Sequence, residues 1–395
     1  MEPILRRLVA EPTITGDYEP NKRAYDYVNH YLSSRGMYVE RFVFNGIESM
    51  VATTQPTKQP AVYLCAHMDV APADIEQFEL HIDGDKLYGR GTYDMKGSLA
   101  VYMQLVDELK GRLSEYDFGI LITGDEEVGG YNGAAKLIEL GYVPRKACVI
   151  PDGGEDWNIE TFCKGLWFFR LTTNGVTAHG SRPWEGESAL EKMLTLLDAI
   201  RALFDKPDKT PTTSTITVGT LRSGEAVNQI PGQATAEIDI RTTNLAEHFE
   251  KRSAIEALAK EHDAVIEMFA EGVPFRNGLD NPYVKQFADD IEAVTGRPAG
   301  TTFSYAGSDG RHFTPIGVPC VIVRSPGGGH HGPEEWISAK GLVQMHDILL
   351  RYLNTLAKNS GTPTKTGTHK KTVRPTQYAF NVPPSTMPGS PSLLK

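Results

Sequence analysis

The sequence predicts an α/β fold in which a mostly parallel sheet has helices on both faces and is interrupted by an inserted α+β domain. The first observation is that short apolar runs, each the length of a buried strand, alternate with stretches of helical periodicity. This pattern is typical of a parallel sheet with crossover helices. The second observation is a change of pattern near residue 165. From there on, polar and apolar residues alternate within the expected strands, and the expected elements follow the order βαββαβ of a ferredoxin-like unit. At 395 residues the chain is also long enough for two domains.

Residues 1–164 are expected to form the first part of the α/β domain. Apolar and aromatic side chains recur at helical spacing over 19–35 and are followed by Gly36, which predicts a helix that ends there. A loop with several acids is expected over 72–84. The other expected elements are strands at 37–44, 49–54, 61–66, 118–123 and 147–150 and helices at 96–109 and 133–140.

Residues 165–276 are expected to form the inserted domain, and residues 277–358 the second part of the α/β domain. The inserted domain is expected to have strands at 166–176, 213–221, 233–243 and 264–270 and helices at 187–204 and 246–262. The second part is expected to have helices at 282–295 and 340–357, a loop at 306–313 and a strand at 318–323. Residues 359–395 are rich in Ser, Thr, Pro and Lys and poor in aliphatic residues, which predicts a disordered tail.

Composition argues against several classes of protein. The formal net charge of −10 does not favour a nucleic-acid partner. No apolar run approaches the ~20 residues of a membrane span, and the first residues lack the pattern of a signal peptide. The four cysteines (Cys65, Cys148, Cys163 and Cys320) show no CxxC spacing, which suits reduced thiols in the cytoplasm. We therefore expect a cytoplasmic protein without a nucleic-acid or membrane partner.

Acids and histidines follow four of the apolar runs. Asp125, Glu126 and Glu127 come directly after the run at 118–123, and the other three runs lead to His67 with Asp69, to Asp152, and to His330 with His331. In an open α/β sheet, ligands bind at the carboxyl ends of the strands. Buried acids are costly unless a positive charge holds them. The four runs together therefore predict a metal site.

Each of these residues also has an ordinary structural explanation when it is taken singly. A histidine at a strand end is usually structural, Asp94 before a helix could be an N-cap, and Asp152 in an Asp-Gly pair could belong to a turn. Positions two apart on a strand share a face, so Asp69 could accept the ring N–H of His67 and orient it. These separate structural roles do not explain why so many acids and histidines occur together at the ends of apolar runs.

The motifs HMDV, GRGTYDMKGS, GDEEVGG, PDGG and HGPEEW occur in an order and spacing that resemble the di-zinc peptidase and deacylase family. This family includes aminoacylase, glutamate carboxypeptidase, acetylornithine deacetylase and succinyl-diaminopimelate desuccinylase. The resemblance covers about residues 1–357, and it implies that the inserted domain is a lid and dimerisation domain. One departure is Glu334, where the family more often has Asn or Asp.

The resemblance implies a role for each residue of the site. It places His67 and Asp152 on one zinc ion, Glu127 and His331 on the other, and Asp94 between them. It makes Glu126 the general base that acts on a metal-bridging hydroxide, and Asp69 the residue that orients His67. Zinc suits such His and carboxylate ligands, and Co²⁺ or Mn²⁺ could replace it.

The resemblance also implies roles for residues of the inserted domain. His179 is similar to a histidine that stabilises the oxyanion across a homodimer, and Asn228 is similar to its companion. Arg241, at the end of EIDIR, and Arg311, in SDGRHF, are candidates to hold a substrate carboxylate, because a guanidinium can bind it through two hydrogen bonds.

These observations favour a zinc-dependent hydrolase that cleaves an amide bond in an N-acyl amino acid or a short peptide with a free carboxylate. The alternative within the same chemistry is an aminopeptidase or dipeptidase that recognises a free α-amine. A binding protein that has kept the fold and lost the chemistry is the third hypothesis. It predicts substitutions among the ligand positions, and the sequence shows none.

Overall fold

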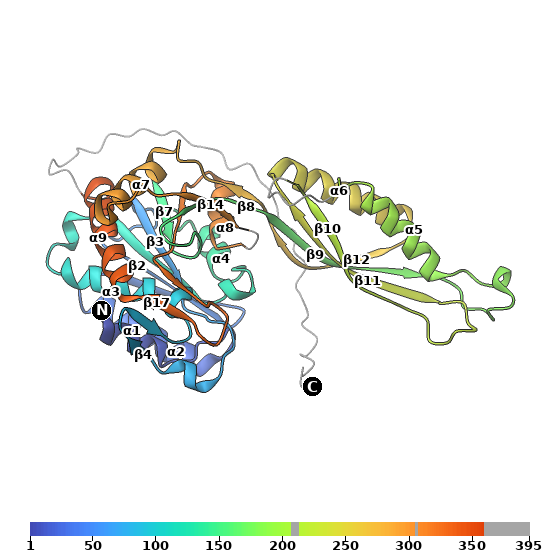
Figure 1. Ribbon diagram of the computed structural model, residues 1–395, viewed down its shortest axis with the longest axis horizontal. Helices are drawn as coiled ribbons and strands as arrows, with labels where there is room; N and C mark the ends of the chain where they lie inside the picture. The colour runs from blue at the N-terminus through green and yellow to red at the C-terminus, as the bar shows by residue number, and fades with distance from the viewer. Residues whose placement is uncertain (207–212, 305–306, 359–395) are drawn as a thin grey trace. The chain divides into compact units, whose positions relative to one another are not determined.

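The structure is a computed structural model that describes residues 1–206, 213–304 and 307–358 (Figure 1). Its central element is a six-stranded sheet in the order β1-β2-β6-β3-β7-β15. Strands β6, β3, β7 and β15 run parallel to one another, and the β1–β2 hairpin joins β6 in antiparallel fashion. The strands are β1 (Tyr38–Phe44), β2 (Ile47–Thr53), β3 (Val62–His67), β6 (Phe118–Thr123), β7 (Ala147–Ile150) and β15 (Cys320–Ile322).

The two faces of this sheet are packed against different helices (Figure 1). Alternate residues of a strand point to opposite faces, so Leu64 joins one buried cluster while its neighbours Tyr63 and Cys65 join another. The first cluster also contains side chains of α1 (Glu2–Val9), α2 (Tyr18–Ser33), α3 (Gly97–Glu108), α7 (Pro282–Thr295) and α9 (Ala339–Leu356). The second contains side chains of α4 (Ala134–Glu139) and α8 (Gly310–Phe313). The predicted mostly parallel sheet with helices on both faces is confirmed.

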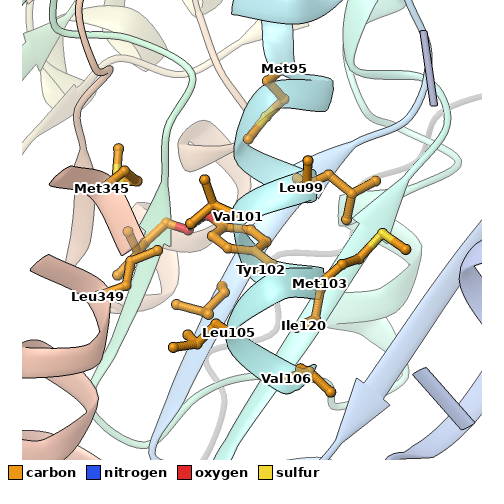
Figure 2. Packing of buried hydrophobic residues seen from close by; sticks show 14 of the residues in the cluster. Met95, Leu99, Val101, Tyr102, Met103, Leu105, Val106, Ile120, Met345 and Leu349 are labelled. Atoms are coloured by element: carbon orange, nitrogen blue, oxygen red, sulfur yellow. Dashed lines mark hydrogen bonds between the residues drawn. The ribbon is translucent and has the colours of Figure 1, made fainter. Parts of the chain in front are cut away.

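Helix α3 lies within the first cluster and is buried on most of its surface. Its side chains pack against β6 and α9, and Leu99 and Met103 lie on the same side of the helix (Figure 2). Leu99 has no exposed surface. This packing fixes the position of the segment just before α3, which carries Asp94.

Replacing Leu99 by Ala is expected to lower the free energy of unfolding by about 2–5 kcal/mol, because a buried cavity is left behind. Urea denaturation of the metal-free protein measures the loss. Leu194, in the middle of α5 (Ala189–Arg201), is 38% exposed, so the Leu194→Ala variant should lose clearly less unfolding free energy than Leu99→Ala. Equal losses in the two variants would show that α3 is not part of the stabilising core.

The inserted region forms a sheet of its own, with the order β10-β11-β9-β12 and antiparallel pairing throughout. Its strands are β9 (Gly165–Asn174), β10 (Thr215–Ser223), β11 (Gln233–Thr242) and β12 (Val265–Gly272). Side chains of α5 and α6 (Leu245–Glu261) pack on this sheet in a separate buried cluster. The order of elements along the chain is the predicted βαββαβ. The boundaries at 164/165 and 276/277 stay predictions, and the predicted tail, 359–395, lies outside the described residues.

Several short elements were not predicted. Helix α1 is one, and two small sheets are others, with the orders β13-β8-β14 and β16-β17-β5-β4. Their strands are β4 (His81–Asp83), β5 (Lys86–Tyr88), β8 (Ile159–Cys163), β13 (Phe275–Arg276), β14 (Thr301–Ser304), β16 (Gly327–Gly328) and β17 (Trp336–Ser338). The predicted loop at 72–84 contains β4, and the predicted loop at 306–313 contains α8. Strands of two to five residues are too short to show a period in the sequence.

No helix in the described ranges is long and apolar enough to cross a membrane.

Candidate metal centre

The carboxyl ends of three of the four parallel strands bring four of the predicted site residues to one edge of the sheet. His67 is the last residue of β3, Glu126 and Glu127 follow β6, and Asp152 follows β7. Because the strands are parallel, these ends meet at the same edge. Asp94 comes from the segment before α3, where Gly91 adopts a left-handed conformation with φ of 80°.

Two groups of potential metal donors lie at this edge. The donor atoms of His67, Glu126 and Asp152 all lie within 4.8 Å of one another, and so do those of Asp94, Glu127 and His331. The two oxygens of Asp94 face both groups. Its Oδ1 is 3.0 Å from His67 Nε2, and its Oδ2 is 3.3 Å from His331 Nε2. The structure therefore brings together all five predicted ligands and Glu126, with Asp94 between the two groups.

The electrostatics of this cluster suit a cation. Burial raises the pKa of Glu126 well above its usual range, and the nearby charge of Asp152 adds to this rise. Hydrogen bonds with Asp94 and Glu127 raise the pKa of His331 to about 10. Carboxylates and imidazoles that share protons at these distances offer the oxygen and nitrogen donors that zinc prefers. The residues present thus fit a site for divalent metal.

The Asp69 side chain is buried, and its main contacts are with the backbone of the loop that follows β6. Its carboxylate accepts hydrogen bonds from the backbone N–H groups of Glu126 and Glu127, each at 3.2 Å, and from the Thr15 hydroxyl at 2.9 Å. The Nδ1 atom of His67 is 2.9 Å from the backbone oxygen of Asp69 and 3.5 Å from its carboxylate. The nearer partner of the imidazole is thus the backbone of Asp69, whereas the sequence pattern predicted its side chain.

Glu335 is a buried acid of the centre that sequence reasoning missed. Its Oε1 accepts the backbone N–H groups of Tyr93 and Asp94, at 2.9 and 3.0 Å. Its Oε2 accepts the N–H of Gly91 at 3.0 Å and a guanidinium N–H of Arg90 at 2.6 Å. The pairing of β17 with β5 brings it there, since Trp336 lies opposite Tyr88. Glu335 therefore fixes the backbone that carries Asp94.

Arg324 is a second residue of the centre that the sequence did not predict. It follows β15 by two residues, so it reaches the same edge of the sheet as the acids that follow β6 and β7. Its Nη2 is 3.0 Å from Asp94 Oδ1, and it also donates a hydrogen bond to Asp152 Oδ1. Burial would raise the pKa of Asp94, but the charge of Arg324 and the hydrogen bonds from the two histidines hold it well below its usual range. The sequence contained one indication of this role, because Arg324 is the first polar residue after an apolar run.

The other predicted site residues lie in three places. Arg311, in α8, is largely buried and its Nη2 is 3.7 Å from Glu126 Oε1, so it borders the donor groups. Arg241 lies near the end of β11, where its Nε donates a hydrogen bond to Asp239 at 2.8 Å. His179 and Asn228 are exposed residues in loops of the inserted sheet, where Gly180, next to His179, donates its backbone N–H to Asn228 O. Within the described residues, no hydrogen bond or ion pair joins these two to the donor groups.

Comparison with known proteins agrees with this geometry. A model of the peptidase family M20/M25/M40 matches residues 63–355. A succinyl-diaminopimelate desuccinylase from Hydrogenovibrio crunogenus is 26% identical over 347 residues, which are 82% of this chain and 90% of that protein. One from Gluconacetobacter diazotrophicus is 29% identical over 319 residues, 75% of this chain and 81% of that protein.

Solved structures share the fold. A tripeptidase from Staphylococcus aureus superposes with a TM-score of 0.71 at 20% identity and covers 90% of this chain and 97% of its own. An M20 family metallo-carboxypeptidase from Sulfolobus solfataricus superposes with a TM-score of 0.70 at 17% identity, over 88% of this chain and 97% of its own. The family model covers most of the sequence, and it confirms the resemblance inferred from the motifs. The chain belongs to the peptidase family M20/M25/M40 and is a hydrolase of amide bonds.

Proposed function

We propose that this chain is a di-zinc hydrolase that cleaves an amide bond in an N-acyl amino acid or a short peptide with a free carboxylate. The observation that carries the proposal is that Asp94 lies between two donor groups, with one oxygen toward His67 and the other toward His331. In the proposal His67, Asp94 and Asp152 hold one ion, and Asp94, Glu127 and His331 hold the other. Two such ions would activate a water molecule and polarise the amide carbonyl.

The side chains around the donor groups support specific tasks. Glu126 has its carboxylate beside His67 and Asp152, and in the proposal it takes a proton from the attacking water and passes it to the leaving nitrogen. Asp69 holds the backbone of Glu126 and thereby its direction. Arg311, at 3.7 Å from Glu126, is the candidate in the described part of the α/β region to hold the substrate carboxylate. Arg241 is the second candidate.

His179 and Asn228 are assigned to the oxyanion in the proposal, acting on the site of a second copy in a homodimer. Their exposure and their position side by side support this role, because an exposed pair is available to another chain. We also place the enzyme in the cytoplasm, which is supported by four free, buried cysteines (Cys65, Cys148, Cys163 and Cys320).

The name of the two relatives described above, succinyl-diaminopimelate desuccinylase, supports a deacylase. The alternative, an aminopeptidase that recognises a free α-amine, is less well supported. Its best argument is the likeness to a tripeptidase and an aminopeptidase, but at 20% and 19% identity this likeness shows the fold alone.

Dialysis against a chelator is expected to remove the metal and abolish amide hydrolysis, and Zn²⁺, Co²⁺ or Mn²⁺ should restore it. Amine release is measured with a set of N-acetylated and N-succinylated amino acids and, in parallel, with free-amine dipeptides that have the same C-terminal residue. Faster turnover of the acylated set is expected. Faster turnover of the free-amine set would favour the aminopeptidase, and undiminished activity of metal-free protein would refute the metal mechanism.

A further inference from the structure

Arg324 places a permanent positive charge inside the candidate metal centre. The residue is 8% exposed, and its guanidinium lies over the ring of Tyr93 at 4.9 Å from the ring centre. Its Nη2 contacts Asp94 Oδ1 at 3.0 Å and donates a hydrogen bond to Asp152 Oδ1. Its Nε has no hydrogen-bond partner in the described part of the chain. The two carboxylates are therefore the main polar partners of this buried cation.

The same two oxygen atoms face His67. Its Nε2 is 3.0 Å from Asp94 Oδ1 and 3.9 Å from Asp152 Oδ1. A metal ion held by His67, Asp94 and Asp152 would share these two oxygens with the guanidinium, which already contacts both of them. Two positive charges at about 4 Å also repel each other, most strongly where water is excluded. Arg324 and a metal ion at His67 are thus in competition.

The other donor group has no such competitor. Glu127 Oε1 accepts the backbone N–H of Ala71 at 3.1 Å, and Glu127 Oε2 is 3.0 Å from His331 Nε2. Asp94 faces this group through Oδ2, whereas the contact of Arg324 at 3.0 Å is with Oδ1. No Lys or Arg within the described ranges forms an ion pair with Glu127. The two metal positions therefore differ in the charge that surrounds them.

We propose that Arg324 is an internal counter-cation of the metal centre. It neutralises Asp94 and Asp152 in the metal-free protein and weakens metal binding at the His67 position relative to the His331 position. This inference rests on the proposed function, because it takes His67, Asp94 and Asp152 as ligands of one ion. Arg324 acts through the ligands and is not itself assigned a chemical step.

The test is metal affinity, measured without reference to activity. Metal-free protein is titrated with Zn²⁺ in competition with a chromophoric chelator, and with Co²⁺ followed by its visible absorption. Wild type is expected to bind two ions with unequal affinities. In Arg324→Met the weaker of the two metal affinities, assigned to the His67 position, should rise by about tenfold or more, which is within the typical range of coupling between sites. The stronger affinity, at the His331 position, should stay the same. Arg297→Met, which removes an exposed arginine paired with Asp156, is the control and should match wild type.

Thermal melting adds a second readout. The melting temperature of metal-free Arg324→Met is expected to be lower than that of wild type, because two buried carboxylates lose their cation. Excess Zn²⁺ should reduce this difference in melting temperature. If this variant does not fold without metal, Arg324→Gln takes its place, because glutamine is neutral yet can donate hydrogen bonds to the carboxylates. It should show the same gain in affinity.

Two results would overturn the inference. One is an unchanged weaker affinity in the neutral variants, and the other is a loss of that affinity, which would show that Arg324 supports the ligands instead of competing for them. Either result leaves the proposed function standing as long as wild type binds two ions. A wild-type protein that binds no Zn²⁺ or Co²⁺ would instead refute the proposed function.

Discussion

Replacing Glu126 by Gln is expected to leave the metal content unchanged and to lower kcat by about 10²–10⁴-fold, the usual contribution of a general base. Glutamine keeps the shape of the side chain but cannot accept and return a proton. The backbone N–H of Glu126 stays bonded to Asp69 in the variant, so the loop should keep its conformation. Metal content by elemental analysis and kcat with an acylated amino acid are measured on the same preparation.

The adjacent residue provides the matched control. Glu127→Gln makes the same chemical change one position away, on the side chain whose Oε2 is 3.0 Å from His331 Nε2. If Glu127 is a ligand, this variant should lose metal as well as activity. The reverse outcome, with metal lost from Glu126→Gln and retained in Glu127→Gln, would exchange the roles assigned to the two acids. This distinction matters because the donor atom of Glu126 lies within 4.8 Å of those of His67 and Asp152.

Replacing Glu335 by Ala is expected to cost about 3–5 kcal/mol of unfolding free energy, the largest stability effect in this set. The side chain of Glu335 is fully buried and that of Arg90 is 3% exposed. Removing the carboxylate leaves a buried guanidinium without its counter-charge and three backbone N–H groups without their acceptor. Urea unfolding of metal-free protein measures the loss, and zinc affinity should fall too because Asp94 is held less firmly.

An exposed ion pair serves as the control for Glu335→Ala. Glu2 and Arg6 form a pair at 2.8 Å with side chains 51% and 48% exposed, so Glu2→Ala should cost less than about 1 kcal/mol. The double variant Arg90→Met with Glu335→Met removes both charges and should recover part of the lost stability. A loss below about 1 kcal/mol for Glu335→Ala would show that this clamp does not stabilise the fold.

The sequence predicted the central sheet and the ligand cluster for one physical reason. Buried parallel strands appear as uninterrupted apolar runs, so the first polar residues after them mark a single edge in space. His67, Asp152 and the two glutamates could be found in this way. The assignment of Asp94 as a ligand came from the resemblance, since an aspartate before a helix looks like an ordinary cap.

The residues that were missed depend on contacts that leave no local pattern. Glu335 reaches Asp94 only because β17 pairs with β5, and strands of three residues show no periodicity. Arg324 marks a strand end as the acids do, but its sequence neighbours do not reveal which carboxylates it meets. The hydrogen bonding of Asp69 depends on the orientation of a peptide group, which an HxD pattern does not specify.

The parallel pairing of β7 with β15 has a consequence for how the enzyme is made. Cys148 lies opposite Cys320, so this contact joins residues far apart in the sequence and closes a loop that includes the whole inserted sheet. A nascent chain that has emerged as far as residue 300 contains every acidic member of the two donor groups but neither Arg324 nor His331. Chains are synthesised from the N-terminus at about 5–20 residues per second. The candidate metal centre can therefore be completed only after residue 331 has been synthesised, and a nascent chain must carry its acids without their final partners until then.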